Sequence, residues 1–175
     1  MLKCISVHQP YASLLSIGAK RYETRNWTSP YRGWVAIHAG KNSDTVDELS
    51  HEIADYMENH EPLEGFVKFV VLALKANERT AELQDLRDLP RGAIIGIARL
   101  TDCIKGETLL PGLGEQERAF GYFSALDEQR YGWQFEDAMP LPNPIYMTGQ
   151  QGLFTINEHI TQQVRDQWRY MKKGA

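Results

Sequence analysis

The sequence of 175 residues has only two cysteines and no long apolar run. Two cysteines, Cys4 and Cys103, do not provide a disulfide framework or a metal cage by themselves, so we expect no metal. The longest apolar run, residues 66–74, is interrupted by Lys68, whereas a membrane span needs about 20 apolar residues. The N-terminus also lacks the apolar stretch of a secretory signal. We therefore expect a soluble, cytoplasmic protein that is not associated with a membrane.

Repeats, low-complexity segments and linkers rich in proline, glycine or serine are also absent. Hydrophobic residues make up 42% and charged residues 24% of the chain, close to the average of globular proteins. We therefore expect one domain over residues 1–175. The glycines around Leu113 lack the strand-turn-helix context of a dinucleotide-binding loop, and no cofactor is expected. The oligomeric state stays open.

The chain has no excess of positive charge, because its formal net charge is −4. This argues against broad, nonspecific binding of nucleic acid. The charges are unevenly distributed, however: residues 1–42 contain six Lys and Arg against one Glu, and residues 43–65 contain eight acids and no Lys or Arg. A small basic cleft beside a solvated acidic helix is one interpretation, and chance clustering on the surface is the other.

The alternation of short apolar segments and turns predicts several strands. We expect strands at residues 4–7, 21–27, 34–39, 93–100, 131–136, 145–147 and 153–156. Apolar residues at helical spacing predict helices at 11–17, from 43 onward, at 66–74, around 83–86 and at 157–172. Residues 43–89 therefore form a helical insertion. Helices grouped in this way predict an α+β fold, a small mixed β-barrel flanked by helices, rather than a doubly wound sheet.

The segment that follows Gly18 carries the candidate chemistry. On a regular strand Glu23 and Arg25 share one face, whereas Lys20 lies on the other face unless the turn after Gly18 redirects it. If the three converge, Glu23 can hold a cation against a phosphate or carbonyl, and an enclosed lysine can act as a base. The alternative is an exposed strand with ordinary ion pairs.

Ordered blocks of residues beyond this segment resemble the ASCH (activating signal cointegrator homology) domain family. The resemblance covers most of the chain except residues 43–88 and the C-terminal helix. Its blocks are Ile5-Ser6-Val7-His8-Gln9-Pro10-Tyr11, Gly18-x-Lys20-x-x-Glu23-x-Arg25-x-Trp27, Tyr31-Arg32-Gly33, Leu89-Pro90-Arg91-Gly92, Tyr131-Gly132-Trp133, Pro140 to Ile145 and Gln150-Gln151-Gly152-Leu153-Phe154.

This resemblance implies a barrel similar to the PUA fold, with a cleft at the Gly-x-Lys-x-x-Glu-x-Arg motif. Members bind RNA or other nucleic acid there, and some are nucleases or amidohydrolases. By motif position, Lys20, Glu23 and Arg25 are the implied cleft residues. In small bacterial members similar to N(4)-acetylcytidine deacetylases, a nucleophilic threonine stands at the position of Glu23. Here the nearest hydroxyl is Thr24, on the opposite face of a strand, which argues against the same chemistry.

Three further residues have both a binding and a structural interpretation. The amide of Gln9 can read a base edge, or it can bond to backbone at a helix start. Trp27 and Tyr31 flank the basic strand, so each can stack on an unpaired base or pack in the core.

The histidines at the ends of apolar strands, His8 and His38, are expected to be buried and hydrogen-bonded. His38 also forms a candidate proton-transfer or phosphate pair with Lys41, because histidine titrates near neutral pH.

The favoured function is binding of nucleic acid, above all unpaired or terminal regions of RNA, through the basic cleft. The alternative is a hydrolase, either a ribonuclease or an amidohydrolase acting on a modified nucleoside such as N(4)-acetylcytidine. In that case Lys20 serves as the base or charge stabiliser and Glu23 as its catalytic partner. Whether the protein is an enzyme stays open, and a third option is a protein partner that binds the helical insertion.

Overall fold

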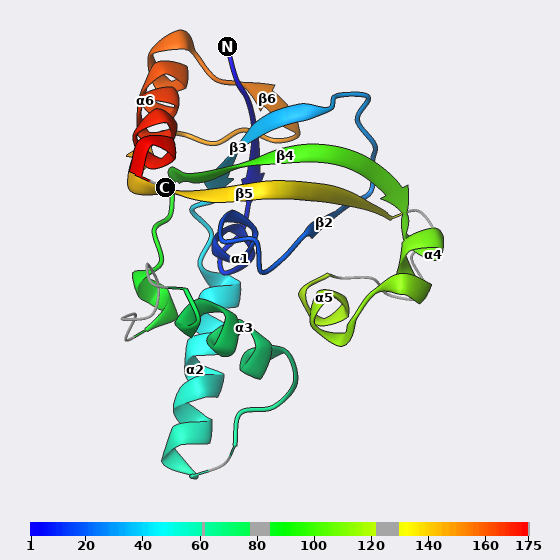
Figure 1. Cartoon of the computed structure of the whole chain (residues 1–175). Coiled ribbons are helices and arrows are strands. Elements are labelled where there is room, and N and C mark those ends of the chain that lie inside the picture. Colours follow the sequence, from blue (N-terminus) through cyan, green and yellow to red (C-terminus); the bar gives the residue numbers. More distant parts are fainter. Residues whose placement is uncertain (61, 78–84, 122–129, 175) are drawn as a thin grey trace.

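The structure, a computed structural model, describes residues 1–60, 62–77, 85–121 and 130–174. Six strands form one curled sheet, with helices against its surfaces (Figure 1). The strands are β1 (Lys3–Val7), β2 (Tyr22–Arg25), β3 (Gly33–Ala39), β4 (Ala93–Lys105), β5 (Tyr131–Tyr146) and β6 (Leu153–Thr155). The helices are α1 (Tyr11–Ser16), α2 (Asp44–Glu58), α3 (Gly65–Lys75), α4 (Gly106–Leu109), α5 (Glu115–Phe120) and α6 (Glu158–Gly174), with 3-10 helices η1 (Leu86–Asp88) and η2 (Leu110–Gly112).

The sheet has the strand order β2-β5-β4-β3-β1-β6. Only the β1–β3 pair is parallel, and the other four pairs are antiparallel. The register between β4 and β5 shifts at three places, and such irregularities increase the twist and bend of a strand. The expected α+β fold with a small mixed barrel and flanking helices is confirmed, and the barrel takes the form of a curled half-barrel sheet.

The proline-rich end of β5 departs from the prediction. Two separate strands were expected at residues 131–136 and 145–147, but β5 is one strand over Tyr131–Tyr146. The reason is that β5 pairs with β2 only over residues 131–134, so its later part is an edge, where proline removes no ladder hydrogen bond. The side-chain amide of Gln167 on α6 supports this part, accepting from Asn143 N at 2.9 Å and donating to Asn143 O at 3.1 Å.

Three clusters of buried side chains cover the two faces of the sheet and the helical region. One lies between α1 and the strands around Trp133, and a second lies under α6 around Val164. The third joins α1 to α2, α3 and α5, which lie together below the sheet in Figure 1. Of the expected short helix at 83–86, Leu83 lies outside the described residues, and η1 begins at Leu86. Within the described ranges, no helix is long and apolar enough to cross a membrane.

Candidate functional site

The turn between α1 and β2 brings Lys20, Glu23 and Arg25 together. Gly18 has a φ of 78°, a conformation that glycine adopts without strain, and Lys20 N then donates to Leu14 O at 3.0 Å. Lys20 Nζ lies 3.7 Å from one carboxylate oxygen of Glu23, and Arg25 Nη2 lies 3.2 Å from the other. The turn therefore redirects Lys20 toward the face of β2 that carries the other two residues.

Lys20 is buried, with only 1% of its side chain exposed. Its Nζ donates to Phe120 O at 2.7 Å and lies 5.6 Å from the centre of the Tyr11 ring. Burial lowers the pKa of Lys20, and the neighbouring carboxylates of Glu23 and Glu117 oppose this shift. Lys20 is thus a largely enclosed amine whose charge depends on two acids.

Arg25 is the most accessible member of the three, with 24% of its side chain exposed. Its Nη2 also donates to Ser6 O at 2.7 Å, which fixes the guanidinium against the C-terminal end of β1. Its Nε is buried and has no hydrogen-bond partner within the described residues. The site therefore presents one positioned cation with an unused donor, because buried polar groups are ordinarily paired.

Glu117 on α5 completes the charge cluster, although no sequence motif identifies it. Its Oε1 accepts from Arg21 N at 2.8 Å and from Arg21 Nε at 3.1 Å. Its Oε2 is buried and unpartnered within the part of the chain that the structure describes. Glu117 lies 96 residues from Arg21 in sequence, so no local spacing pattern could have placed it beside Lys20.

The other candidates near β2 use their polar atoms within the protein. The Gln9 amide donates to Pro90 O at 2.8 Å and accepts from Ser13 N at 3.0 Å, and the residue is 1% exposed. The half-buried Trp27 packs edge-on against Trp133, with ring centres 4.5 Å apart. The half-buried Tyr31 donates its hydroxyl to Trp34 O at 2.9 Å. These contacts agree with the structural interpretation of each residue.

His38 adjoins the site through Ser6. Its Nδ1 lies 3.2 Å from Ser6 Oγ and its Nε2 lies 3.1 Å from Met147 O. Because a carbonyl only accepts, Nε2 carries the proton and Nδ1 accepts from the serine. Burial is the main cause of the lowered pKa of His38, and the positive charge of the exposed Lys41 lowers it further.

The two histidines predicted to be buried differ in the structure. His38 is buried as expected, but His8 is exposed, so the prediction for His8 was wrong. His8 lies just beyond the end of β1, where the sheet no longer covers it.

The lowered pKa of His38 predicts a pH-dependent stability. In the unfolded chain His38 takes up a proton near pH 6.5, whereas in the folded chain it stays neutral to lower pH. The unfolded state therefore binds more protons as pH falls below 6.5, and stability decreases by at most about 1.4 kcal/mol per pH unit. Urea unfolding of the wild type and His38→Gln at pH 7.5, 6.5 and 5.5 should show the steeper loss only in the wild type; parallel curves would refute the assignment.

Metal ligands are not grouped in the described residues: no three or more His, Cys, Asp and Glu side chains lie close enough to share an ion. Both cysteines are free thiols, and burial raises the pKa of Cys4. The charged groups at the site are the amine of Lys20, the guanidinium of Arg25 and the carboxylates of Glu23 and Glu117.

Comparisons with solved structures give the fold. The ASCH protein of Zymomonas mobilis matches with a TM-score of 0.53 and 16% identity, over 94% of this chain and 93% of that one. A mutant of the same protein matches with a TM-score of 0.52 and 14% identity, over 94% of this chain and 96% of the other. At these identities the likeness concerns the fold alone.

Sequence comparisons give the family. Activating signal cointegrator 1 of Homo sapiens is 33% identical over 103 residues, which are 58% of this chain and 14% of that protein. The protein of the same name from Mus musculus is 30% identical over the same shares, so this chain corresponds to a small part of these relatives. The ASCH domain profile matches residues 5–148. Because that match extends over most of its length, the chain belongs to the ASCH domain family, which is associated with nucleic-acid binding.

Proposed function

We propose that this protein binds single-stranded or terminal regions of RNA at the surface around Arg25. The observation that carries the proposal is the positioned guanidinium of Arg25, held by Glu23 and Ser6 O, with a buried Nε that has no partner in the described chain. A guanidinium is suited to phosphate, since its planar fork donates two parallel hydrogen bonds. Family membership supports the same ligand class.

Lys20 lies buried beneath this surface, where it pairs with Glu23. With 1% of its side chain exposed, it is positioned to neutralise Glu23 rather than to contact a bound strand. Glu23 is in turn 12% exposed and bonds both cations. The pair thus holds Arg25 in one orientation, which reduces the entropy lost when Arg25 binds a phosphate.

Arg25→Gln tests this role. The amide keeps some hydrogen-bonding capacity but loses the charge, so we expect binding of a short single-stranded RNA to weaken by about tenfold, the value of one charge-assisted hydrogen bond. The slope of log K against log salt should fall by about 0.7, because one phosphate contact is lost. Fluorescence anisotropy with a labelled RNA at several salt concentrations measures both.

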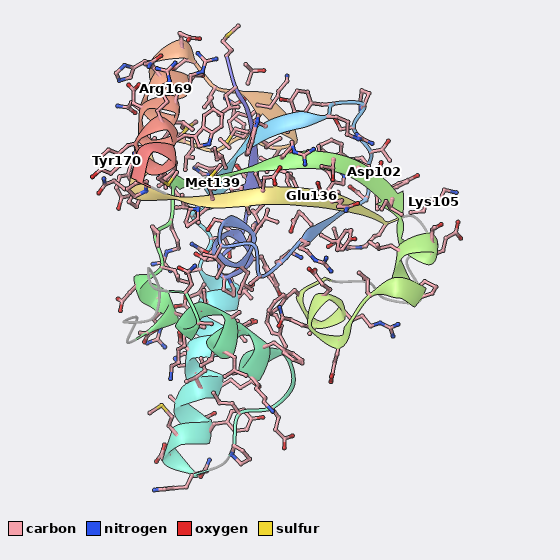
Figure 2. All side chains as sticks on the ribbon, viewed as in Figure 1. Asp102, Lys105, Glu136, Met139, Arg169 and Tyr170 are labelled. Atoms are coloured by element: carbon pink, nitrogen blue, oxygen red, sulfur yellow. The ribbon has the colours of Figure 1, made fainter. Side chains whose placement is uncertain are left out.

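The matched control is Arg169→Gln. Arg169 is exposed and pairs with Asp166 on α6; it lies at the upper left in Figure 2, whereas β2 lies to the right of centre in the same view in Figure 1. Its loss should leave affinity and salt slope unchanged. Equal effects of the two substitutions would contradict binding at Arg25 and would indicate general attraction of RNA to the protein.

A hydrolase acting on RNA or on a modified nucleoside is the second candidate. The observation that favours it is Lys20, an enclosed amine with a lowered pKa beside a carboxylate, because an amine whose pKa is lowered can act as a general base. Thr24 does not serve as the nucleophile in this proposal, since Glu23 and Arg25 pair on one face of β2 and alternation places Thr24 on the other.

Product formation distinguishes the two candidates. RNA and N(4)-acetylcytidine are incubated with the wild type and with Lys20→Arg, which keeps a cation but removes the base. Shortened RNA or free acetate from the wild type alone would establish the hydrolase. Bound but unchanged RNA in both samples would leave binding as the function.

A further inference from the structure

One rim of the sheet gathers three loops that the binding site does not include. β1 and β3 are parallel and end in register at Val7 and Ala39, and β4 begins beside them at Ala93. Gly40 N donates to Val7 O, and Gly92 N donates to Ala39 O, each at 2.8 Å. The residues that follow β1 and β3 and those that precede β4 therefore lie side by side.

Each of these loops contributes a basic side chain. His8 and Lys41 are exposed and Arg91 is half-buried. The Lys41 stem covers Gly92, since a Cβ built on that glycine would lie 3.1 Å from Lys41 Cε. The imidazole of His8 lies beside Gly40, 3.8 Å from the position of a Cβ there. Three basic groups thus surround one short stretch of backbone, and we call them the cationic rim.

Arg91 is the unusual member of the rim. Its Nη1 is buried and has no hydrogen-bond partner in the described chain. The remaining arginines within the described ranges have interaction partners, and most pair with a carboxylate. Neither Lys41 nor His8 forms an ion pair with a described residue either. Desolvating a guanidinium nitrogen without a partner costs about 1–3 kcal/mol or more, so an acceptor supplied by a ligand would stabilise this donor.

We propose that the cationic rim binds a phosphate group of the RNA strand whose neighbouring part occupies the Arg25 site. This inference rests on the proposed function. The two sites are close along the chain, because Arg25 bonds Ser6 O and His8 follows two residues later, about 7 Å along an extended strand. Arginine supplies the bidentate fork and lysine the compact charge, the two groups that contact phosphate most often in nucleic-acid complexes.

The rim is tested first without RNA, using tripolyphosphate as the probe in calorimetric titrations. The variant is the double substitution Lys41→Gln/Arg91→Gln, and the control is Lys68→Gln/Arg169→Gln, which removes one exposed lysine and one exposed arginine elsewhere. We expect the affinity of the rim variant to fall by at least about tenfold, as for the loss of one or more charge-assisted hydrogen bonds. Equal affinities of rim and control variants would overturn the proposal.

The second arm uses single-stranded RNAs of four and twelve nucleotides, each with a 5′-phosphate or a 5′-hydroxyl. If the rim binds the strand's internal phosphates, the rim variant loses affinity for the long RNA with either end, and the salt slope falls by about 1.4 for two contacts. A loss confined to 5′-phosphorylated RNA instead assigns the rim to the terminal phosphate. An unchanged affinity for every RNA, with Arg25→Gln still impaired, would overturn the rim and leave the proposed function intact.

Failure of the two proposals is therefore distinguishable. If the wild type binds no RNA, the proposed function fails, while the tripolyphosphate titration still shows whether the rim binds phosphate. Thermal unfolding checks that the variants fold; if the double variant does not, Arg91→Lys replaces it. That substitution keeps the charge and loses the planar fork, so it should weaken binding less than Arg91→Gln, and equal affinity to the wild type would refute a role for the guanidinium.

Discussion

We expect replacement of Lys20 by methionine to lower the free energy of unfolding by about 3 kcal/mol, because removal of the amine from a buried charge cluster leaves its carboxylates with less compensating charge. The Lys20 side chain is 1% exposed, and Glu23 and Glu117 beside it are 12% and 7% exposed. Methionine fills a similar volume, so packing changes little. The loss arises instead from the two carboxylates, of which Glu23 keeps Arg25 while Glu117 keeps the exposed Arg21.

A double-mutant cycle isolates this electrostatic origin. Urea unfolding is measured for the wild type, Lys20→Met, Glu117→Gln and the double variant. Neutralising Glu117 in the methionine background should recover part of the lost stability, since it removes one of the stranded charges, and the coupling energy should be about 1 kcal/mol or more. Strictly additive effects, or a methionine variant as stable as the wild type, would contradict the cluster as described.

Truncation of Trp133 to alanine has the second large effect, a loss of about 4 kcal/mol. Trp133 is fully buried, packs edge-on against Trp27 and donates its indole N–H to Trp27 O at 2.9 Å. It also lies opposite Glu23 in the ladder between β5 and β2. Its loss should therefore release β2, so that RNA affinity falls together with stability.

Two comparisons make that result specific. Trp133→Phe keeps most of the buried area but lacks the indole N–H, so it should cost about 1 kcal/mol for the hydrogen bond plus a smaller packing loss. Tyr170→Ala removes an aromatic side chain that is 76% exposed on α6 (Figure 2) and should change stability by less than about 0.5 kcal/mol. Chemical denaturation of all three at one pH gives the ranking; a Trp133→Ala variant as stable as Tyr170→Ala would be inconsistent with the core.

The sequence predicts the strands best where a strand is central and apolar. β4 begins at Ala93 as expected because its first residues are β-branched and buried. It continues to Lys105 since its exposed end still pairs with β5, a long-range pairing that local composition does not encode. The prolines of residues 140–144 predicted a break in the strand, but a strand tolerates proline where it lies at a sheet edge. Local composition does not show that this part of β5 is an edge, because that too depends on long-range pairing.

The site is only partly predictable for a similar reason. Lys20, Glu23 and Arg25 lie within six residues, so alternation and the turn at Gly18 already relate them. Glu117 and Phe120 O come from a helix about a hundred residues away, and no sequence spacing points to them. His8 and His38 show the other limit, since both follow apolar strand residues and only the end of β1 leaves His8 exposed.

Binding of RNA at the Arg25 surface is tested most directly by nuclear magnetic resonance titration of the isotope-labelled protein with a short single-stranded RNA. We expect the Nε resonance of Arg25 and the amides of β2 and of Ser6 to His8 to shift first, with α6 unchanged. Those shifts should disappear in Arg25→Gln while the remaining spectrum stays folded. Shifts confined to α6 or to the acidic α2, or none at all at saturating RNA, would contradict binding of RNA at this surface.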